Sequence, residues 1–367
     1  MTDDSQRPRP SAGELPVLPD SPRDGELPVL PPAIGVYGAP RPAVPQRLPM
    51  APRHGGCASG AGVGLAAAAA DGSGFRRLPE WLKVRLPGSG EYAETRALLR
   101  RQNLHTVCEE AHCPNLGHCW ARGTATVMIL GDLCTRRCGF CAVPPGKPNG
   151  WIDWDEPRRV GEAVAAMGLR HTVITSVARD DLTDGGSTIF AHTIRAIRER
   201  SGTVIEVLVP DFRGHVEDLA RVVDAAPEVI NHNVETCERL HPVVRPSARY
   251  DRSLELLQRV KALSGGTIKS KSGIMLGLGE TDDEVQRTLE DLRAHGCDLL
   301  TIGQYLRPSP NHLPVVEFVH PDRFRHWGEV ATRLGFENAA SGPLVRSSFH
   351  ADVLAGTVRA GENSKAE

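Results

Sequence analysis

The feature that most constrains the fold is a regular alternation of short apolar runs with amphipathic segments, which begins near Leu78. Apolar runs of strand length are each followed by a segment with apolar residues at helical spacing. We expect strands at residues 124–130, 172–177, 203–209, 229–234, 268–276 and 299–305, and helices at residues 156–168, 187–200, 214–225, 253–263, 282–295 and 321–334. Right-handed crossovers between such units give a parallel sheet, either doubly wound or curled into a barrel.

Six strand–helix units are fewer than the eight of a closed barrel. We therefore predict an α/β fold, a partial (β/α)6 TIM-like barrel with N- and C-terminal extensions and a disordered N-terminal tail. The expected boundaries are a tail at residues 1–72, an N-terminal extension at 73–122, the barrel at 123–335 and a C-terminal extension at 336–367. In either kind of parallel sheet, the chemistry belongs at the C-terminal ends of the strands.

The first 72 residues have a different composition. Proline and glycine are dense, and the run GELPVLP at residues 13–19 returns at residues 25–31. The prolines disfavour a helix or a central strand, and two copies are too few for a repeat fold. We expect a disordered tail, with a partner-binding polyproline segment as the alternative.

Charge and hydropathy exclude several classes of function. The 43 basic and 45 acidic residues give a net charge of -2, so there is no electrostatic case for nucleic acid or for a membrane surface. No apolar run reaches the length of a membrane span, and the N-terminus lacks the pattern of a secretory signal. Acidic residues near the start argue against a transit peptide. We expect a cytoplasmic protein, whose nine cysteines then indicate metal or redox chemistry rather than disulfides.

Three cysteines follow the first predicted strand directly. Cys134, Cys138 and Cys141 have the spacing C-x3-C-x2-C and fall on a loop at the C-terminal end of that strand. Three such thiolates can hold three irons of a 4Fe–4S cluster and leave the fourth iron open for a small molecule. The alternatives are chance clustering and a zinc site, which usually has four protein ligands in C-x2-C pairs.

This motif, with Gly139 and Phe140 before its last cysteine, resembles the signature of the radical S-adenosylmethionine superfamily. The resemblance implies that the open iron chelates the amino and carboxylate groups of S-adenosylmethionine. One electron then cleaves the sulfonium, and the resulting 5′-deoxyadenosyl radical removes hydrogen from an unactivated carbon. The cofactor supplies this chemistry, while the protein positions it and excludes water.

A second set, Cys108, Cys113 and Cys119, precedes the first strand with the spacing C-x4-C-x5-C. This set, together with the run RSSF at residues 346–349, resembles the lipoyl synthases. The resemblance implies a second 4Fe–4S cluster that is held by these cysteines and by a serine, which we assign to Ser348 in preference to Ser347. Family members commonly have tyrosine where Phe349 lies. Without the cysteine sets, the two serines would be an ordinary polar loop.

The resemblance extends from about residue 79 to residue 352 and includes TSVARDDLTDGG, NHNVET, KSGIMLGLGET and GQYLRPSPNHLPV. Two departures are Ala178 and Arg307, which stand where aspartate and glutamine are usual. The remaining cysteines, Cys57, Cys237 and Cys297, we expect to be inert thiols.

By position, further residues resemble those that contact S-adenosylmethionine in the superfamily. These candidates are Asp184, Gly185, Gly186, Asn233, Glu235, Arg245 and Gly277. Each has a structural alternative. The first three could form an ordinary turn with a helix cap, the next three could be satisfied structural polar groups, and Gly277 could be a plain strand-to-turn glycine. We expect no catalytic side chain, because homolytic chemistry needs no general base.

The resemblance implies sulfur insertion at C6 and C8 of an octanoyl group that is amide-linked to a carrier lysine, with the second cluster as the sulfur donor. The implied partners are octanoylated lipoyl domains of 2-oxoacid dehydrogenase E2 subunits, the glycine cleavage H protein, a ferredoxin or flavodoxin electron donor and iron–sulfur cluster carrier proteins. Two other hypotheses are a different sulfur-inserting radical enzyme with a second cluster and a non-enzymatic iron–sulfur carrier.

Overall fold

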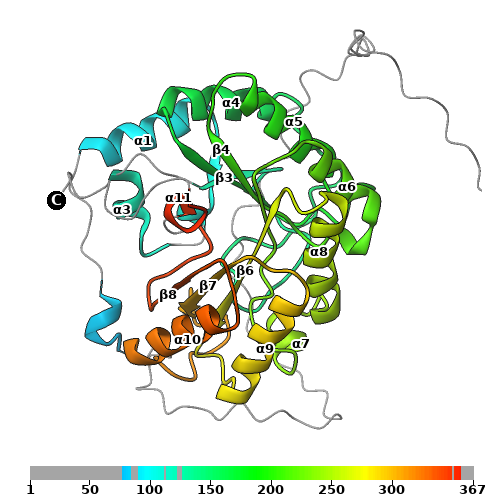
Figure 1. Ribbon diagram of the computed structural model, residues 1–367. Coiled ribbons are helices and arrows are strands. Elements are labelled where there is room, and N and C mark those ends of the chain that lie inside the picture. Colours follow the sequence, from blue (N-terminus) through cyan, green and yellow to red (C-terminus); the bar gives the residue numbers. More distant parts are fainter. Residues whose placement is uncertain (1–76, 84–89, 111–112, 122–125, 349–350, 357–367) are drawn as a thin grey trace, which may run out of the picture. The chain divides into compact units, whose positions relative to one another are not determined.

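The computed structural model describes residues 77–83, 90–110, 113–121, 126–348 and 351–356 (Figure 1). All of them belong to one unit of the chain, residues 63–367. The tail predicted at residues 1–72 and Cys57 lie outside the described residues.

Eight strands form one sheet, and their order in space follows their order in the sequence. The strands are β1 (His105–Thr106), β2 (Thr126–Ile129), β3 (His171–Ser176), β4 (Val204–Leu208), β5 (Val229–Asn231), β6 (Lys269–Leu276), β7 (Leu299–Gln304) and β8 (Asn338–Ser341). Neighbours from β2 to β8 are parallel, and β1 pairs with β2 antiparallel. A doubly wound sheet would reverse its strand order, so this sequential order identifies the partial barrel.

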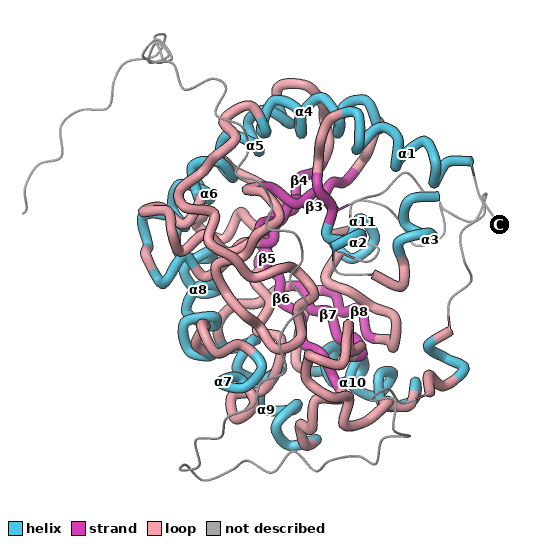
Figure 2. Tube along the Cα trace, turned by 180° about the vertical axis from the view of Figure 1, so that it is seen from behind, coloured by secondary structure: helices cyan, strands magenta, loops and turns pink. Residues whose placement is uncertain are grey.

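The helices of the six strand–helix units follow their strands and lie along the outer face of the sheet, as Figures 1 and 2 show. The described helices are η1 (Glu80–Leu82), α1 (Gly90–Arg101), α2 (Val107–Glu110), α3 (Leu116–Ala121), α4 (Glu156–Met167), α5 (Ser187–Arg198), η2 (Phe212–Gly214), α6 (Val216–Asp224), α7 (His241–Val244), α8 (Tyr250–Leu263), α9 (Asp282–Ala294), α10 (Pro321–Arg333) and α11 (Ala351–Leu354). None of these is long and apolar enough to cross a membrane.

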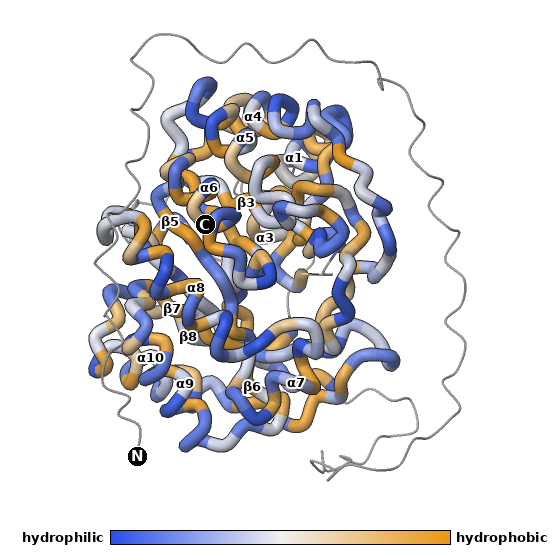
Figure 3. Tube along the Cα trace, turned by 90° about the vertical axis from the view of Figure 1, so that its right-hand side faces the viewer, coloured by the Kyte–Doolittle hydropathy of each residue, from blue (hydrophilic) through white to orange (hydrophobic). Residues whose placement is uncertain are grey.

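Local sequence explains where these helices begin. Helix α9 is an example: the Thr281 side chain accepts a hydrogen bond from the Glu284 amide, and the Glu284 carboxylate accepts one from the Thr281 amide. This reciprocal cap satisfies two amides that would otherwise lack partners at the helix start. Val285, Leu289 and Leu292 then form a buried face of the helix. Figure 3 shows the general pattern, with hydrophobic colours in strand segments such as β5 and hydrophilic colours on outer turns.

All six predicted strand–helix units are confirmed, from β2–α4 to β7–α10. The sequence reasoning missed β1, β8 and the α-helices outside these six units, which are α1, α2, α3, α7 and α11. Strand β8 is a further parallel strand, and α11 contacts both β8 and β3. Leu354 of α11 packs in a cluster with Val229 and Leu299, so the chain closes the open barrel from within at the N-terminal ends of the strands (Figure 1).

The barrel interior also contains a buried ion pair. Glu206 and Lys271 are both 0% exposed, and the Lys271 Nζ lies 2.8 Å from the Glu206 Oε1. The His171 Nε2 lies 3.4 Å from the other carboxylate oxygen. Burial raises the pKa of Glu206, but Lys271 and His171 more than offset this and lower it overall.

Candidate functional site: two cysteine sets at the barrel mouth

The first cysteine loop leaves β2 at the C-terminal edge of the sheet and folds back on itself. The Cys134 amide donates to the Pro144 carbonyl at 2.9 Å, and the Cys134 carbonyl accepts from the Gly146 amide at 2.8 Å. The Cys141 amide donates to the Cys138 carbonyl at 3.2 Å. These bonds hold the three thiols in one short loop at the mouth.

The three thiols are free and partly buried. Burial, then the neighbouring thiols Cys138 and Cys134, raise the pKa of Cys141 to about 12. Burial raises the pKa of Cys138 to about 11, against the opposing charge of Arg245. The raised pKa values of Cys138 and Cys141 favour the protonated thiols, and iron would displace those protons. Within the described residues, no three His, Cys, Asp or Glu side chains converge on one metal ion. In a 4Fe–4S cluster each thiolate ligates a different iron, so the thiols need not converge on one point. These three cysteines fit such a cluster.

An arginine inside the motif anchors the loop to the two neighbouring strands. The Arg136 side chain is 6% exposed and donates to both Asp180 carboxylate oxygens, at 2.7 and 2.8 Å, and to the Asp211 carboxylate at 2.5 Å. The Thr135 amide also donates to the Ala178 carbonyl at 3.0 Å. Only the backbone of Ala178 makes this contact, so the departure from aspartate at that position leaves it intact.

The segment after β7 also holds the first cysteine loop in place. The Leu313 amide donates to the Gly139 carbonyl at 3.0 Å, and the His312 Nε2 lies 2.9 Å from the Cys141 carbonyl. The Ser309 hydroxyl lies 2.8 Å from the His312 Nδ1, which leaves the Nε2 proton for the carbonyl. The Arg307 Nε donates to the His312 carbonyl at 3.0 Å. Arginine at this position, where glutamine is usual, therefore helps to hold His312 in place.

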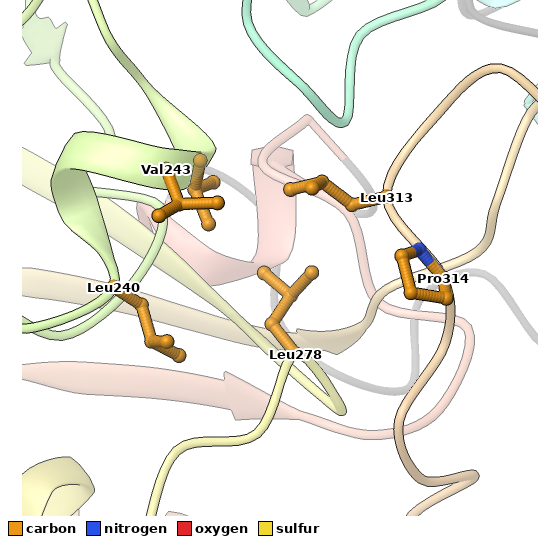
Figure 4. Close-up of a pocket in the computed structure, with 6 residues that line it drawn as sticks. Leu240, Val243, Leu278, Leu313 and Pro314 are labelled. Carbon is orange, nitrogen blue, oxygen red and sulfur yellow. The ribbon is translucent and has the colours of Figure 1, made fainter. Parts of the chain in front are cut away.

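The same contacts explain a glycine in the motif. The Gly139 amide donates to the Val244 carbonyl at 2.9 Å, and a side chain at Gly139 would lie 2.8 Å from a Leu313 methyl carbon. Beside them is a small apolar recess, shown in Figure 4, whose lining residues are Leu240, Val243, Val244, Leu278, Leu313 and Pro314.

The glycine turn after β3 lies at the start of α5. The Asp184 carboxylate accepts from the Gly186 amide at 2.9 Å and from the Thr188 amide at 3.0 Å. Burial raises the pKa of Asp184, but these hydrogen bonds more than offset it and lower it overall. Gly185 and Gly186 both have positive φ, and a side chain at Gly186 would clash with Leu130. The turn is thus a helix cap, and its contact with S-adenosylmethionine stays a prediction.

The polar residues after β5 meet at the mouth. The Asn233 Nδ2 donates to the Glu235 Oε1 at 3.1 Å, and the Arg245 Nη1 donates to the Asn233 carbonyl at 2.7 Å. Burial raises the pKa of Glu235, which Arg245 and Asn233 partly oppose. The buried Asn233 Oδ1 has no hydrogen-bond partner among the described residues. The structure therefore brings these three residues together.

Gly277 has a protein reason to be glycine. It has a φ of 98°, and a side chain there would clash with the Gln304 amide and the Glu317 carbonyl. Its amide donates to the Glu280 carboxylate at 2.6 Å. Its proposed contact with a flat ring stays a prediction.

The second cysteine set lies on and between α2 and α3. The Cys113 amide donates to the Cys108 carbonyl at 3.1 Å, and the Cys119 amide donates to the Asn115 carbonyl at 2.9 Å. Burial raises the pKa of both Cys108 and Cys113. These three cysteines also fit a 4Fe–4S cluster, whose fourth ligand must then come from elsewhere in the chain.

The C-terminal segment crosses the mouth to reach this set. The Asn115 Nδ2 donates to the Leu344 carbonyl at 2.7 Å. A side chain at Gly303 in β7 would clash with the Val345 carbonyl, so the segment lies directly on the strand end. The charge of Arg346 opposes the effect of burial on the pKa of Cys113. Ser347 and Ser348 follow at once, and Ser348 as the ligand stays a prediction.

Three side chains that support this site were not predicted to do so from the sequence: Arg136, Asp211 and His312. Arg136 lies between two of the motif cysteines, and His312 lies in one of the runs that resemble the family. Cys237 and Cys297 are buried in hydrophobic clusters, and that both thiols are inert stays a prediction.

Comparison of the sequence with known proteins identifies the family. Residues 128–292 match the radical SAM superfamily, and residues 67–113 match the N-terminal domain of lipoyl synthase. The lipoyl synthase of Symbiobacterium thermophilum is 57% identical over 75% of this chain and 86% of its own length. That of Rubrobacter xylanophilus is 55% identical over 74% and 85%. The crystal structure of methylornithine synthase aligns with 71% of this chain and 76% of its own at 13% identity and a TM-score of 0.44. The chain therefore belongs to the lipoyl synthase family of the radical SAM superfamily.

Proposed function

We propose that this member of the family takes sulfur from a second 4Fe–4S cluster, which Cys108, Cys113, Cys119 and Ser348 hold. As a radical SAM enzyme it uses a first 4Fe–4S cluster and S-adenosylmethionine, and as a lipoyl synthase it acts on octanoylated carrier proteins. When bound, these groups supply a 5′-deoxyadenosyl radical that removes hydrogen at C6 and C8, and sulfide that replaces it.

The chain's own residues hold and orient these groups. Cys134, Cys138 and Cys141 bind the first cluster and leave one iron open. The turn at residues 184–186 receives the methionine end of S-adenosylmethionine, while Asn233, Glu235 and Arg245 contact its ribose and carboxylate. Gly277 lies beside the adenine. The Asn233 Oδ1, buried without a partner among the described residues, supports this assignment, because a buried acceptor otherwise loses a hydrogen bond.

One observation carries the proposal. The hydrogen bond from Asn115 to the Leu344 carbonyl joins the second cysteine set to the segment that contains Ser348. The same segment lies on the end of β7, at the mouth into which the first cysteine loop also projects. A sulfur source and a radical source at one mouth can both reach one substrate carbon.

Cysteine variants separate the two roles. Replacement of Cys134, Cys138 or Cys141 by alanine should abolish cleavage of S-adenosylmethionine and remove about half of the iron, since each cluster holds the same number of irons. Replacement of Cys108, Cys113 or Cys119 should keep cleavage and prevent sulfur insertion. Cys237→Ala is the matched control, because Cys237 is buried outside both sets. The readout is product mass after a single turnover on an octanoyl-lysine peptide. Full lipoyl formation by the Cys113→Ala variant would show that sulfur comes from elsewhere.

The serine ligand is tested by three variants. Ser348→Ala should leave three thiolate ligands and a labile second cluster. Ser348→Cys should give a stable cluster with slower sulfur release, because thiolate suits iron–sulfur chemistry better than the harder alkoxide does. Ser347→Ala is the matched control and should behave as wild type. If only Ser347→Ala destabilises the second cluster, the ligand is Ser347.

Family membership supports the finer assignments of partner and location. We propose that the carriers are lipoyl domains of 2-oxoacid dehydrogenase E2 subunits and the glycine cleavage H protein, that ferredoxin or flavodoxin supplies electrons, and that cluster carrier proteins rebuild the second cluster, all in the cytoplasm. Turnover with each purified octanoylated carrier, compared with the free peptide, tests the first assignment. Equal rates for all of them would argue against carrier recognition.

A further inference from the structure

The junction between β2 and the first cysteine loop has an unusual conformation. Leu130 directly follows β2 and has a φ of 68°, in the left-handed region that residues other than glycine rarely adopt. Gly131 continues the turn with a φ of 87°, and Cys134 comes three residues later. Leu130 is buried in the largest hydrophobic cluster of the barrel. A buried leucine in this conformation needs support from its surroundings.

Two charged side chains bind the backbone of Leu130. Its amide donates to the Glu156 carboxylate at 2.7 Å, and its carbonyl accepts from the Arg179 Nη1 at 3.2 Å. Glu156, the first residue of α4, is 5% exposed, and Arg179 is 1% exposed. Arg179 is held in turn by the Asp181 carboxylate, to which its Nε donates at 2.8 Å and its Nη2 at 2.9 Å. Other parts of the barrel therefore fix both polar groups of the Leu130 backbone.

The burial of Glu156 is explained by this contact. Burial raises the pKa of Glu156 to about 7, against the hydrogen bond from Leu130. A carboxyl group removed from water is costly unless it is hydrogen-bonded. An exposed carboxylate at the same helix start would favour α4 without that cost. The buried position of Glu156 thus serves the backbone of Leu130 and not the helix.

The side chain of Leu130 reaches the glycine turn after β3. A side chain at Gly186 would clash with the Leu130 Cδ1, so Leu130 lies directly against this turn. Gly186 has a φ of 89° and leads into α5. Leu130 therefore contacts the turn with its side chain and continues into the first cysteine loop with its backbone. A change in the conformation of Leu130 would move one of these segments relative to the other.

We propose that Glu156 is a positioning residue for S-adenosylmethionine, which acts through Leu130 to set the separation between the first cysteine loop and the turn at residues 184–186. The inference rests on the proposed function, in which the methionine end of this molecule binds both the open iron and the turn. That end has a fixed size, so both contacts form together only when the two segments are correctly placed.

The test measures the binding of radiolabelled S-adenosylmethionine to full-length, anaerobically reconstituted, oxidised variants by equilibrium dialysis. Glu156→Ala removes the acceptor for the Leu130 amide and should weaken binding roughly tenfold, because only molecules with Leu130 correctly held can bind. First-cluster iron should stay at the wild-type level, since the loop keeps the backbone bonds of Cys134 and Cys141. Glu156→Gln keeps an acceptor and should bind within about twofold of wild type.

Glu228→Ala is the matched control. The Glu228 carboxylate also accepts from a strand amide, that of Ile205 at 2.8 Å, but it does so near the N-terminal end of β4, away from the mouth. This variant should bind S-adenosylmethionine as wild type does. If Glu156→Ala does not fold, Glu156→Asp takes its place. It keeps the charge at the start of α4 but shortens the reach to Leu130, and it should weaken binding about threefold.

Wild-type affinity in Glu156→Ala, or in Glu156→Asp where that variant replaces it, would overturn the inference. So would a loss of first-cluster iron in step with affinity, since Glu156 would then support only the cysteine loop. An equal loss of affinity in Glu228→Ala or in Glu156→Gln would also overturn it. Gly186→Ala distinguishes failure of the underlying function, because it displaces the turn itself. If that variant binds as wild type does, the turn does not receive S-adenosylmethionine, whatever Glu156 does.

Discussion

The replacement Arg136→Met tests how the first cysteine loop is held. The variant keeps an unbranched apolar stem, although a shorter one, and removes three charge-assisted hydrogen bonds, two to Asp180 and one to Asp211. Breaking a buried ion pair typically costs about 3–5 kcal/mol, because the remaining charge loses its partner. Here the lower end applies. Asp180 is 30% exposed, and Asp211 keeps Arg252 at 3.2 Å and the Arg213 amide at 3.1 Å.

We therefore expect a loss of about 3 kcal/mol in the free energy of unfolding, measured by urea denaturation of the full-length chain. The control is Arg158→Met, which breaks an exposed pair on α4 and should change stability little. A loss below about 1 kcal/mol for Arg136→Met would refute the reasoning, because it would mean that the loop is held by its backbone bonds alone.

The same pair predicts a dependence on pH. Burial raises the pKa of Asp211, but Arg136 more than offsets it, so the pKa lies below its usual value. A depressed carboxyl pKa contributes stability that is present above the unfolded-state pKa and is lost as the pH falls through the folded-state value. The difference in stability between wild type and Arg136→Met should thus be full at pH 7 and shrink below about pH 4. A difference that stays constant down to pH 3 would contradict this linkage.

Three other outcomes are expected. Gly303→Ala should displace the segment at Val345 and reduce second-cluster iron while the first cluster remains, whereas Gly202→Ala, in open space, should have no effect on iron content. Lys271→Met should leave Glu206 as a buried carboxylate without its main partner, and destabilise the chain by about 3–5 kcal/mol at pH 8 in urea denaturation. The penalty should shrink at pH 5, since Glu206 can then take up a proton. His312→Phe should speed the loss of first-cluster iron to a chelator, since it removes the bond to the Cys141 carbonyl. An unchanged rate would show that this bond does not hold the cysteine loop.

The fold was predictable where local patterns are long. Each of the six strand–helix units contains an apolar run and an amphipathic segment, and the structure has all of them. The pattern did not separate a barrel from a doubly wound sheet, because both have the same local alternation. Strand β1 has two residues and β8 reads NAAS, so neither carries a strand signal. Such strands form because a neighbouring strand end is available for pairing.

The cysteines were predictable because the spacing of ligands within a loop is a local property. Their support was not. Asp211 lies 75 residues from Arg136, and His312 lies 171 residues from Cys141. Nothing near these residues in the sequence indicates their partners. The same limit applies to Asp184, whose sequence context suits a helix cap and a ligand contact equally.

The bond between Asn115 and Leu344 joins residues 229 positions apart. The N-terminal part of a chain is synthesised first, so Cys108, Cys113 and Cys119 leave the ribosome long before the segment that covers them. The second cysteine set must therefore wait, incomplete, until nearly the whole barrel has been made. In the cell, the proposed sulfur-donating cluster on this set could be completed only after the last strand of the barrel and the segment that follows it have been synthesised.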